Sequence, residues 1–300
     1  MHDVIEHKLV PHHVDIARER NGMPLVDFRG GDSVKTVKFA HWRGQLRDVH
    51  TPPRDDYHTI CLHESGSSVR RTGTDAILTP GMAFLQAAED DGIFNSDGQL
   101  DYAHLYLPIN TLEDLKNEID TRSAQRVIVP VEFGCREAEF TRRLADFVAV
   151  IRDTPSPSAI EFDEWTVDIG MTLLRYVTRL EDDALVGAAK SSLTPVQVSK
   201  VVDFVEAKIA TRITLVDLAD MCGISQFRFM RAFKAETGFN PHQYVIERRV
   251  ARAKNLLQDS QDSIADIAYD IGFSSQAHMT DVFRKRVGVT PGQFRRIMRD

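Results

Sequence analysis

Residues 218–244 read LADMCGISQFRFMRAFKAETGFNPHQY, and residues 267–294 read IAYDIGFSSQAHMTDVFRKRVGVTPGQF. The two stretches share one pattern of apolar residues, glycines and proline. The offset between them is 49 residues up to Gly223 and Gly272, and 50 residues afterwards, so one residue is inserted after the glycine in the second copy. Each copy predicts a short helix, a tight turn and a longer second helix, which is the helix-turn-helix pattern. The second helix of that pattern, here called the reader helix, can lie in the major groove of DNA.

A long helix is predicted between the two copies. Residues Pro241–Gln258 carry apolar side chains at helical spacing without interruption. Eighteen residues make a helix of roughly 27 Å at 1.5 Å per residue. Such a helix can hold two reader helices near the separation of about 34 Å that binding to one face of DNA requires. A further helix is expected to start after Thr194, because Pro195 suits the first position of a helix. The C-terminal third is therefore predicted to be an all-helical DNA-binding domain.

Helical periodicity divides each reader helix into an inner and an outer face. Phe229 and Phe233 of the first unit, and Met279 and Phe283 of the second, are predicted to pack inward. The outer residues, for which we predict DNA contacts, are Gln226, Phe227, Met230, Arg231 and Lys234 in the first unit and Gln276, Ala277, Thr280 and Asp281 in the second. Arg231 suits guanine, Gln276 suits adenine, and Asp281 can accept from the amino group of cytosine.

Two of these assignments have alternatives. Phe227 and Met230 either meet an apolar group such as a thymine methyl in the groove or belong to the core of the domain. Asp281 either contacts a base or orients Arg284 or Lys285. Phosphate contacts are expected from helix starts and from the basic side chains Arg228, Lys234, Arg284, Lys285 and Arg286.

The C-terminal residues resemble the AraC/XylS family of bacterial transcriptional regulators. The resemblance covers about Thr194–Arg299 and includes LADMCGIS, FMRAFKAETGFNPHQY, ERRVARAKNLL and IADIAYDIGFSSQAHMTDVFRKRVGVTPGQFR. It implies a seven-helix domain with two reader helices, preceded by a sensory and dimerising domain. Positions matching the family's base-contacting residues are Phe227, Met230, Arg231, Gln276, Ala277, Thr280 and Asp281. Ala277 stands where a longer polar residue is common and Asp281 where a basic one is frequent, which implies a different target sequence.

The N-terminal half is rich in predicted strands. Short segments at residues 34–40, 57–63, 76–78 and 103–107 are separated by turn signals, which favours a compact β-barrel or sandwich. A helix at 111–121, a strand at 126–131 and two longer helices at 136–152 and 160–180 are expected to follow. The segments RTGTDAILTPGMAF, ending at Phe84, and YAHLYLP, starting at Tyr102, loosely resemble the cupin-like effector domain of the same family. The fold class expected is therefore α+β, with a cupin-like β-barrel, trailing helices and the all-α DNA-binding domain.

The resemblance implies that the interior of the barrel holds a small-molecule effector. Because alternate residues of a strand face inward, the candidates for its lining are Phe39, Trp42, His58, Phe84, Tyr102, His104 and Tyr106. Each of them either contacts an effector or is an ordinary core residue.

An apolar stripe on the last N-terminal helix comprises Trp165, Ile169, Leu173, Tyr176 and Leu180. Its three- and four-residue steps indicate either packing within the chain or a dimer helix that pairs with a second copy. The small and polar residues near 186–193 are expected to form a linker. This gives an effector-binding and dimerisation domain at 1–185 and a DNA-binding domain at 194–300.

Composition bounds the cellular setting. The 300 residues are 42% hydrophobic and 27% charged, typical of a soluble globular protein. No apolar run approaches the roughly 18 residues that span a bilayer, and no secretory signal is recognised, so a cytoplasmic protein without a membrane partner is expected. Three widely spaced cysteines, Cys61, Cys135 and Cys222, argue against a disulfide framework or zinc cluster. Residues 193–300 carry 16 basic and 12 acidic side chains within a chain of net charge −7, which suits phosphate contacts at this end.

These observations predict a sequence-specific regulator of transcription that binds double-stranded DNA as a homodimer under the control of a small molecule. Activation, the usual mode of the family, would make RNA polymerase a further partner. Two alternatives remain at this point: a regulator controlled by a partner protein or by its own abundance, and a metal-dependent cupin enzyme. His58, His63, Glu64 and His104 are the only plausible metal ligands, and they lack the close His-x-His pair of metal cupins. No cofactor, bound metal or catalytic residue is therefore expected.

Overall fold

The computed structural model describes residues 35–53, 56–119, 127–154, 157–178 and 192–299, together with the backbone of 25–30. The chain forms two compact units, Met1–Asp153 with Trp165–Ala188 and Thr154–Glu164 with Ala189–Asp300. The division between residues 188 and 189 falls inside the predicted linker, most of which lies outside the described residues. Residues 154–164, expected in the first domain, group with the second unit instead.

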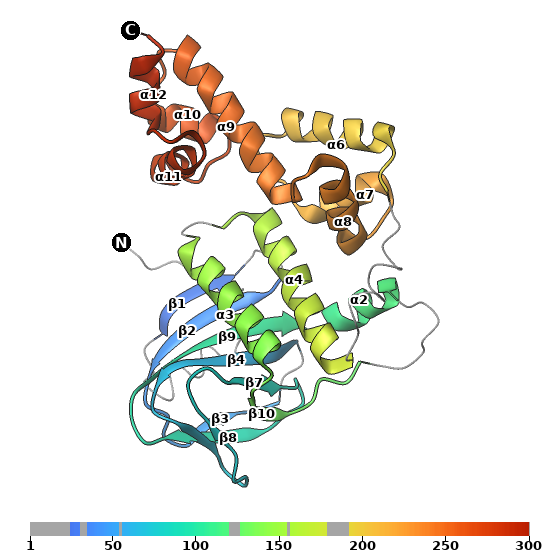
Figure 1. Ribbon diagram of the computed structural model, residues 1–300, viewed down its shortest axis with the longest axis vertical. Helices are drawn as coiled ribbons and strands as arrows, with labels where there is room; N and C mark the ends of the chain where they lie inside the picture. Colours follow the sequence, from blue (N-terminus) through green and yellow to red (C-terminus); the bar gives the residue numbers. More distant parts are fainter. Residues whose placement is uncertain are drawn as a thin grey trace. The chain divides into compact units, whose positions relative to one another are not determined.

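The first unit is built on a six-stranded antiparallel sheet (Figure 1). Its order is β1 (Leu25–Gly30), β2 (Lys38–Gly44), β9 (Leu100–Pro108), β4 (Tyr57–Gly66), β7 (Ala83–Gln86) and β10 (Glu132–Cys135). The two longest strands, β4 and β9, pair from Tyr57 opposite Pro108 to Gly66 opposite Leu100. The described part of the strand predicted at 126–131 is not a strand. That strand forms at β10, where Phe133 lies opposite Phe84 of β7 and the two rings pack 5.1 Å apart.

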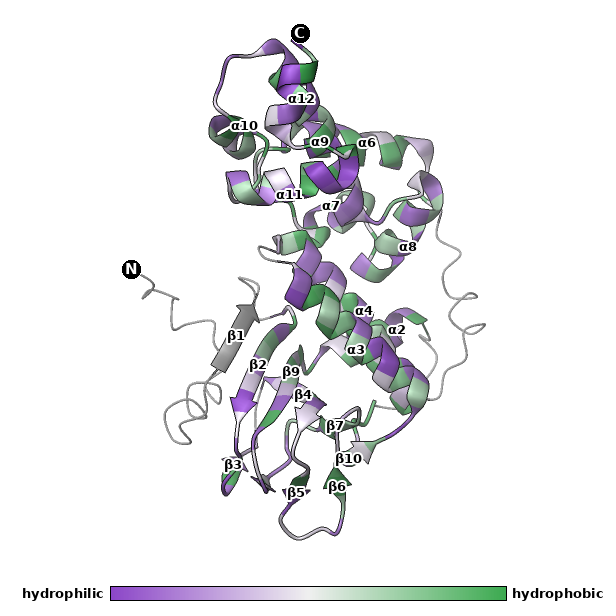
Figure 2. Ribbon diagram, turned by 60° about the vertical axis from the view of Figure 1, so that its left-hand side comes forward, coloured by the Kyte–Doolittle hydropathy of each residue, from purple (hydrophilic) through white to green (hydrophobic). Residues whose placement is uncertain are grey.

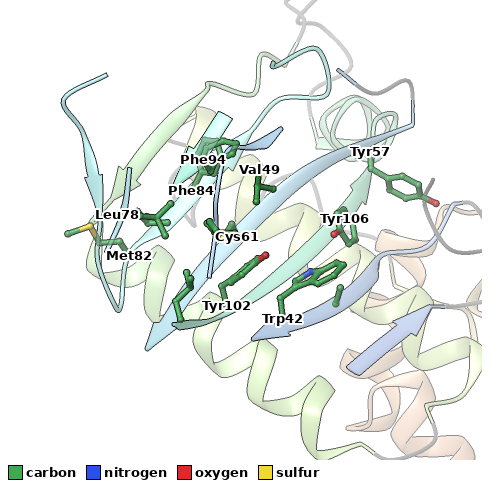
Figure 3. Packing of buried hydrophobic residues seen from close by; sticks show 14 residues of the cluster. Trp42, Val49, Tyr57, Cys61, Leu78, Met82, Phe84, Phe94, Tyr102 and Tyr106 are labelled. Carbon is green, nitrogen blue, oxygen red and sulfur yellow. The ribbon is translucent and has the colours of Figure 1, made fainter. Parts of the chain in front are cut away.

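A second, four-stranded sheet faces the first. Its order is β3 (Val49–Thr51), β8 (Gly92–Ser96), β5 (Val69–Arg71) and β6 (Ile77–Leu78). A cluster of buried aromatic and aliphatic side chains fills the space between the sheets (Figure 3). Among the described strands no hydrogen-bonded pair joins the two sheets, so the N-terminal part is sheet-rich but not the closed barrel that the sequence predicted. The strands of the second sheet are two to five residues long, which limits how far hydrogen bonding can continue around the core.

Helices cover the other face of the large sheet. After α2 (Thr111–Ile119) come α3 (Ala138–Asp153) and α4 (Ala159–Thr178), which lie across the strands in Figure 1. Buried Phe140, Leu144, Val148 and Ile151 form the inner stripe of α3. Hydrophobic and hydrophilic positions alternate along α3 in Figure 2, as expected of a helix with one buried side. In α4, by contrast, only Asp168 and Thr178 are exposed.

The stripe considered for dimerisation is buried within the chain. The Trp165 ring packs against Phe147 of α3 at 6.3 Å, and Tyr176 stacks on Phe140 at 4.3 Å. Ile169 and Leu173 are 1% and 0% exposed. The structure therefore agrees with packing inside one chain, because aromatic side chains of α3 cover both rings. Leu180, the last residue of the predicted stripe, lies outside the described residues.

Seven helices make up residues 195–297 of the second unit. They are α6 (Pro195–Ala207), α7 (Leu215–Cys222), α8 (Gln226–Thr237), α9 (Pro241–Asp259), α10 (Ile264–Asp270), α11 (Gln276–Val287) and α12 (Pro291–Ile297). The repeat is visible in the core: Phe233 packs edge-on against Tyr244 at 5.3 Å, and Phe283 packs against Phe294 at 5.5 Å. Both pairs are separated by eleven residues, so the two halves share one packing scheme.

Local sequence sets the ends of these helices. Thr214 and Asp217 form a capping box at the start of α7, and Thr290 with Gln293 does the same for α12. The reader helices α8 and α11 end at Gly238 and Gly288, both in the left-handed conformation that glycine adopts without a steric penalty. Gly223 and Gly272, at the two predicted tight turns, also have positive φ angles, +67° and +85°.

Candidate nucleic-acid interface

The first reader helix, α8, begins at a serine cap. The hydroxyl of Ser225 accepts a hydrogen bond from the backbone N–H of Arg228, which satisfies one of the free donors at the helix start. Phe229 and Phe233 are fully buried and stack at 5.3 Å, as the predicted inner face requires. The cap and the two rings together fix which residues of α8 face outward.

Phe227 and Met230 do not lie on an exposed face. They are 6% and 9% exposed, which agrees with the alternative that both side chains belong to the core of the domain in the free protein. An aromatic ring and a thioether lose free energy in water, and burial removes that cost. The Arg231 guanidinium lies 5.6 Å from the centre of the Phe227 ring, which orients the arginine by a cation–π contact. Gln226 and Arg231 are half-buried and Lys234 is exposed, so these polar side chains form the accessible part of α8.

The second reader helix, α11, presents a different surface. Ser275 caps it by accepting from the N–H of His278, and Met279 and Phe283 are completely buried. Gln276, Ala277 and Asp281 are all exposed near the start of the helix, and Thr280 is half-buried. The Thr280 hydroxyl donates to the carbonyl of Gln276 at 2.8 Å. The outer face of α11 thus agrees with the predicted pattern.

Charged side chains flank this face. Asp281 lies 3.8 Å from Arg284 in an exposed pair, which fits the alternative that this carboxylate orients a basic neighbour. Lys285 is exposed, and Arg286 pairs with Glu247 of α9 at 3.3 Å. Arg286, for which a phosphate contact was predicted, is therefore paired with a carboxylate of the same unit. Arg284 and Lys285 are exposed in the last turns of α11.

The reader helices also depend on residues that sequence reasoning did not single out. Ser225 and Ser275 stand at equivalent positions, 50 residues apart, and each caps its reader helix. The inserted residue of the second copy lies between Gly272 and Ser275, since α8 starts three residues after Gly223 and α11 four residues after Gly272. A serine just before each reader helix was a detectable signal for these caps.

A family profile described as a helix-turn-helix domain matches residues 218–297. The chain is 33% identical to a transcriptional regulator from Chromobacterium violaceum whose crystal structure is described as containing an AraC-type DNA-binding domain. That similarity covers 34% of this chain and 90% of the other, with a TM-score of 0.33. The C-terminal unit therefore carries a helix-turn-helix domain of the AraC/XylS family.

Two curated relatives each match about a third of the chain or less. It is 30% identical to the probable transcriptional regulator LumQ of Photobacterium leiognathi over 32% of this chain and 39% of LumQ. It is 41% identical to the probable transcription factor PqrA of Proteus vulgaris over 26% of this chain and 64% of PqrA. The chain thus matches less than two thirds of the length of either relative.

The N-terminal unit encloses a small cavity between its two sheets. Its volume is about 50 Å³, and most of the surface exposed to it is apolar. The residues that line it are Leu46, Val49, Thr51, Thr59, Cys61, His63, Val69, Leu78, Phe84, Gln86, Phe94, Leu100, Tyr102, His104 and Phe133. Of the seven residues predicted for effector contact, the structure brings Phe84, Tyr102 and His104 to this cavity.

The other four predicted residues lie elsewhere. Trp42 and Tyr106 belong to the same buried cluster without lining the cavity (Figure 3). Phe39 and His58 alternate with inward residues of β2 and β4, so the pleat places them on the opposite face of the sheet. Thr59, Cys61 and His63 stand at alternate positions of the same strand, on the face opposite to His58, and line the cavity.

The histidines considered as metal ligands serve separate hydrogen bonds. His58 accepts from the N–H of Ala88 at 3.2 Å, His63 lies 3.1 Å from the Ser65 carbonyl, and His104 bonds the Tyr106 hydroxyl at 3.0 Å. Burial lowers the pKa of both His58 and His63, which favours their neutral forms. Within the part of the chain that the structure describes, no three His, Cys, Asp or Glu side chains gather in a metal-binding group.

The remaining sequence expectations concern cysteines and membranes. Cys61, Cys135 and Cys222 are all buried and free. Burial raises the pKa of each thiol, so the reactive thiolate is disfavoured. Among the helices of the described ranges, none combines the length and apolar character needed to cross a membrane.

Proposed function

We propose that this chain is a transcriptional regulator that binds double-stranded DNA through α8 and α11 in successive segments of the major groove. The observation that carries the proposal is the pair of equivalent, serine-capped reader helices in one compact unit. The helix between the two halves, α9, has 19 residues and is therefore roughly 29 Å long at 1.5 Å per residue. This length is close to one turn of DNA.

The accessible side chains support distinct roles in the complex. Arg231, oriented by the Phe227 ring, is proposed to pair with guanine, and the exposed Gln276 with adenine. Lys234, Arg284 and Lys285 are proposed to contact phosphates, together with the N–H groups at the capped helix starts. Phe227 and Met230, which are buried in the free protein, are proposed to support the first reader helix by packing against its neighbours.

Binding to DNA of selected sequence tests this function. A random duplex library would be enriched with the full-length chain, and the selected duplex compared with a scrambled duplex by fluorescence anisotropy at fixed salt. We expect the selected duplex to bind about 10³-fold tighter or better, as specific sites do. Equal affinities for the two duplexes would contradict sequence-specific recognition.

We further propose that the cavity of the N-terminal unit binds a small effector and that the chain acts as an activator that contacts RNA polymerase. The lining supports a mainly apolar ligand, because Phe84, Phe94 and Phe133 pack around the cavity. Polar lining residues such as Gln86 and His104 are proposed to orient it. Coupling to DNA binding would require different affinities of the effector for two states of the protein. A homodimer remains part of the proposal, formed through a surface other than the buried Trp165–Tyr176 stripe.

Thermal unfolding of the full chain with panels of small metabolites tests the effector. A ligand at 100 times its dissociation constant adds about 2.7 kcal/mol of stability. Val69 lines the cavity and is buried, so Val69→Phe fills part of the space and is expected to remove a genuine shift. A shift that survives in Val69→Phe would place the ligand elsewhere.

The size of the cavity favours a second candidate function. About 50 Å³ is far below the roughly 300 Å³ at which ordinary ligand pockets begin. Without opening, it holds only a few water-sized groups. A regulator controlled by a partner protein or by its own abundance needs no larger cavity. Unchanged unfolding temperatures across a broad metabolite panel would favour this second candidate.

A further inference from the structure

Three consecutive charged residues of α9 contact other parts of the C-terminal unit. Glu247 pairs with Arg286 of α11, and Arg248 pairs with Glu206 of α6. Arg249, the third, is only 6% exposed, and its Nε and Nη2 atoms donate to the carbonyls of Ile209 and Thr211 at 3.2 and 3.3 Å. Those carbonyls belong to the segment between α6 and α7, so Arg249 is bonded to the chain just before the first helix-turn-helix.

The same guanidinium also contacts the α10–α11 turn of the second helix-turn-helix. Its Cζ lies 5.9 Å from the centre of the Phe273 ring. A Cβ atom at position 272 would lie 2.8 Å from Nη2 of Arg249 and 2.5 Å from the Ile209 carbonyl oxygen. Only glycine lets the α10–α11 turn approach this closely. The buried arginine is therefore clamped between the α6–α7 segment and the α10–α11 turn.

The equivalent α7–α8 turn of the first helix-turn-helix has no such contact at its glycine. A Cβ atom at Gly223 would meet nothing within 4 Å. The first glycine serves its turn conformation alone, whereas the second also makes room for Arg249. The difference shows that the clamp is a feature of the junction between the units and not of the repeated fold.

The buried charge of Arg249 is retained because two of its nitrogen atoms donate to carbonyls and the Glu161 carboxylate attracts it. Burial lowers the pKa of Arg249 to about 10, so the side chain still carries its charge at neutral pH. Two carbonyls and one aromatic face compensate for the lost water. The planar, forked guanidinium reaches two carbonyls at once, which a lysine ammonium on its flexible stem does less well.

We propose that Arg249 fixes the separation and rotation of the two reader helices, and so sets the spacing between half-sites that the chain accepts in DNA. This inference rests on the proposed function. Arg249 acts as a positioning residue through the α6–α7 segment and the α10–α11 turn. Inserting or deleting one base pair moves one half-site by about 3.4 Å and about 35° relative to the other, so a rigid junction must discriminate between spacings.

The test uses the full-length chain and the duplex that the wild type selects from a random library. Affinities are measured by anisotropy on that duplex and on versions with one base pair added or removed between the half-sites. We expect the wild type to lose about 30-fold on the altered spacings and Arg249→Lys to lose about fivefold or less, within the usual range of coupling between sites. Phe273→Leu, which removes the ring beside the guanidinium together with its packing against His278 and keeps an apolar side chain, should lie between them.

Arg248→Ala is the matched control, because it removes the neighbouring, half-exposed ion pair and should leave the spacing preference unchanged. Unfolding temperatures of all variants separate a loss of fold from a loss of discrimination, and the mild Phe273→Leu variant covers the case in which Arg249→Lys does not fold. If the wild type selects no sequence, the proposed function fails. If it selects a bipartite site and both junction variants keep the full spacing penalty, the inference about Arg249 is overturned.

Discussion

The two helix-turn-helix units share a pattern of sequence but differ in what they expose. In the first, Phe227 and Met230 are buried, and the accessible part of the reader helix is Gln226, Arg231 and Lys234. In the second, the start of α11 exposes Gln276 and Asp281 around the small Ala277. The repeated positions thus fix the packing of each unit, while the chemistry offered to DNA is set separately in each half.

The largest effect is expected where the units are most alike. Phe233 and Phe283 are both 0% exposed and occupy equivalent places beside Tyr244 and Phe294. Phe233→Ala and Phe283→Ala should each lower the free energy of unfolding by about 3–5 kcal/mol, since both leave a cavity in a packed core. Urea denaturation of the full chain measures this. A much smaller loss in one variant would show that the two cores are not equivalent.

Glycine substitutions should sharpen the comparison. Gly223→Ala places a side chain at positive φ and should cost about 1–2 kcal/mol. Gly272→Ala carries the same strain and also clashes with Ile209 and Arg249, so its cost should be larger. Thermal unfolding of the two variants gives the difference directly. Equal unfolding temperatures would argue against a tight junction at Gly272.

Arg231→Ala tests the first reader helix alone. If the guanidinium reads a base, binding to the selected duplex should weaken by about 1–3 kcal/mol, with relaxed preference at one position. Competition with single-base variants of the duplex measures that preference. Equal weakening on specific and scrambled DNA would instead identify Arg231 as a phosphate contact. Lys234→Ala serves as the comparison, because an exposed lysine at phosphate should weaken all duplexes alike.

The smallest effect on stability is expected at Asp281. Its pair with Arg284 is largely exposed, so Asp281→Asn should change the free energy of unfolding by less than about 0.5 kcal/mol. Binding to scrambled DNA should strengthen slightly, because a negative charge near phosphates is removed. A marked loss of preference for one cytosine in the selected duplex would show that Asp281 contacts a base.

Much of the C-terminal unit follows from local sequence. The caps at Ser225 and Ser275, the turn at Gly223 and the start of α9 at Pro241 each follow from the preference of one residue type for one backbone conformation. The N-terminal unit is less predictable. Its strands pair with partners far along the chain, and the parity that separates His58 from the cavity-lining Thr59 depends on that pairing.

The sequence by itself determined the duplicated helix-turn-helix pattern, its single inserted residue and the two-part organisation of the chain, because these depend on spacing and on local conformational preference. Only the tertiary structure decided that Phe227 and Met230 are buried, that Trp165 and Tyr176 pack on α3, and that Arg249 meets Gly272. Each of these facts is a contact between distant segments. Periodicity gives the side of a helix or strand on which a residue lies, but the neighbour on that side comes from the packing of the whole unit.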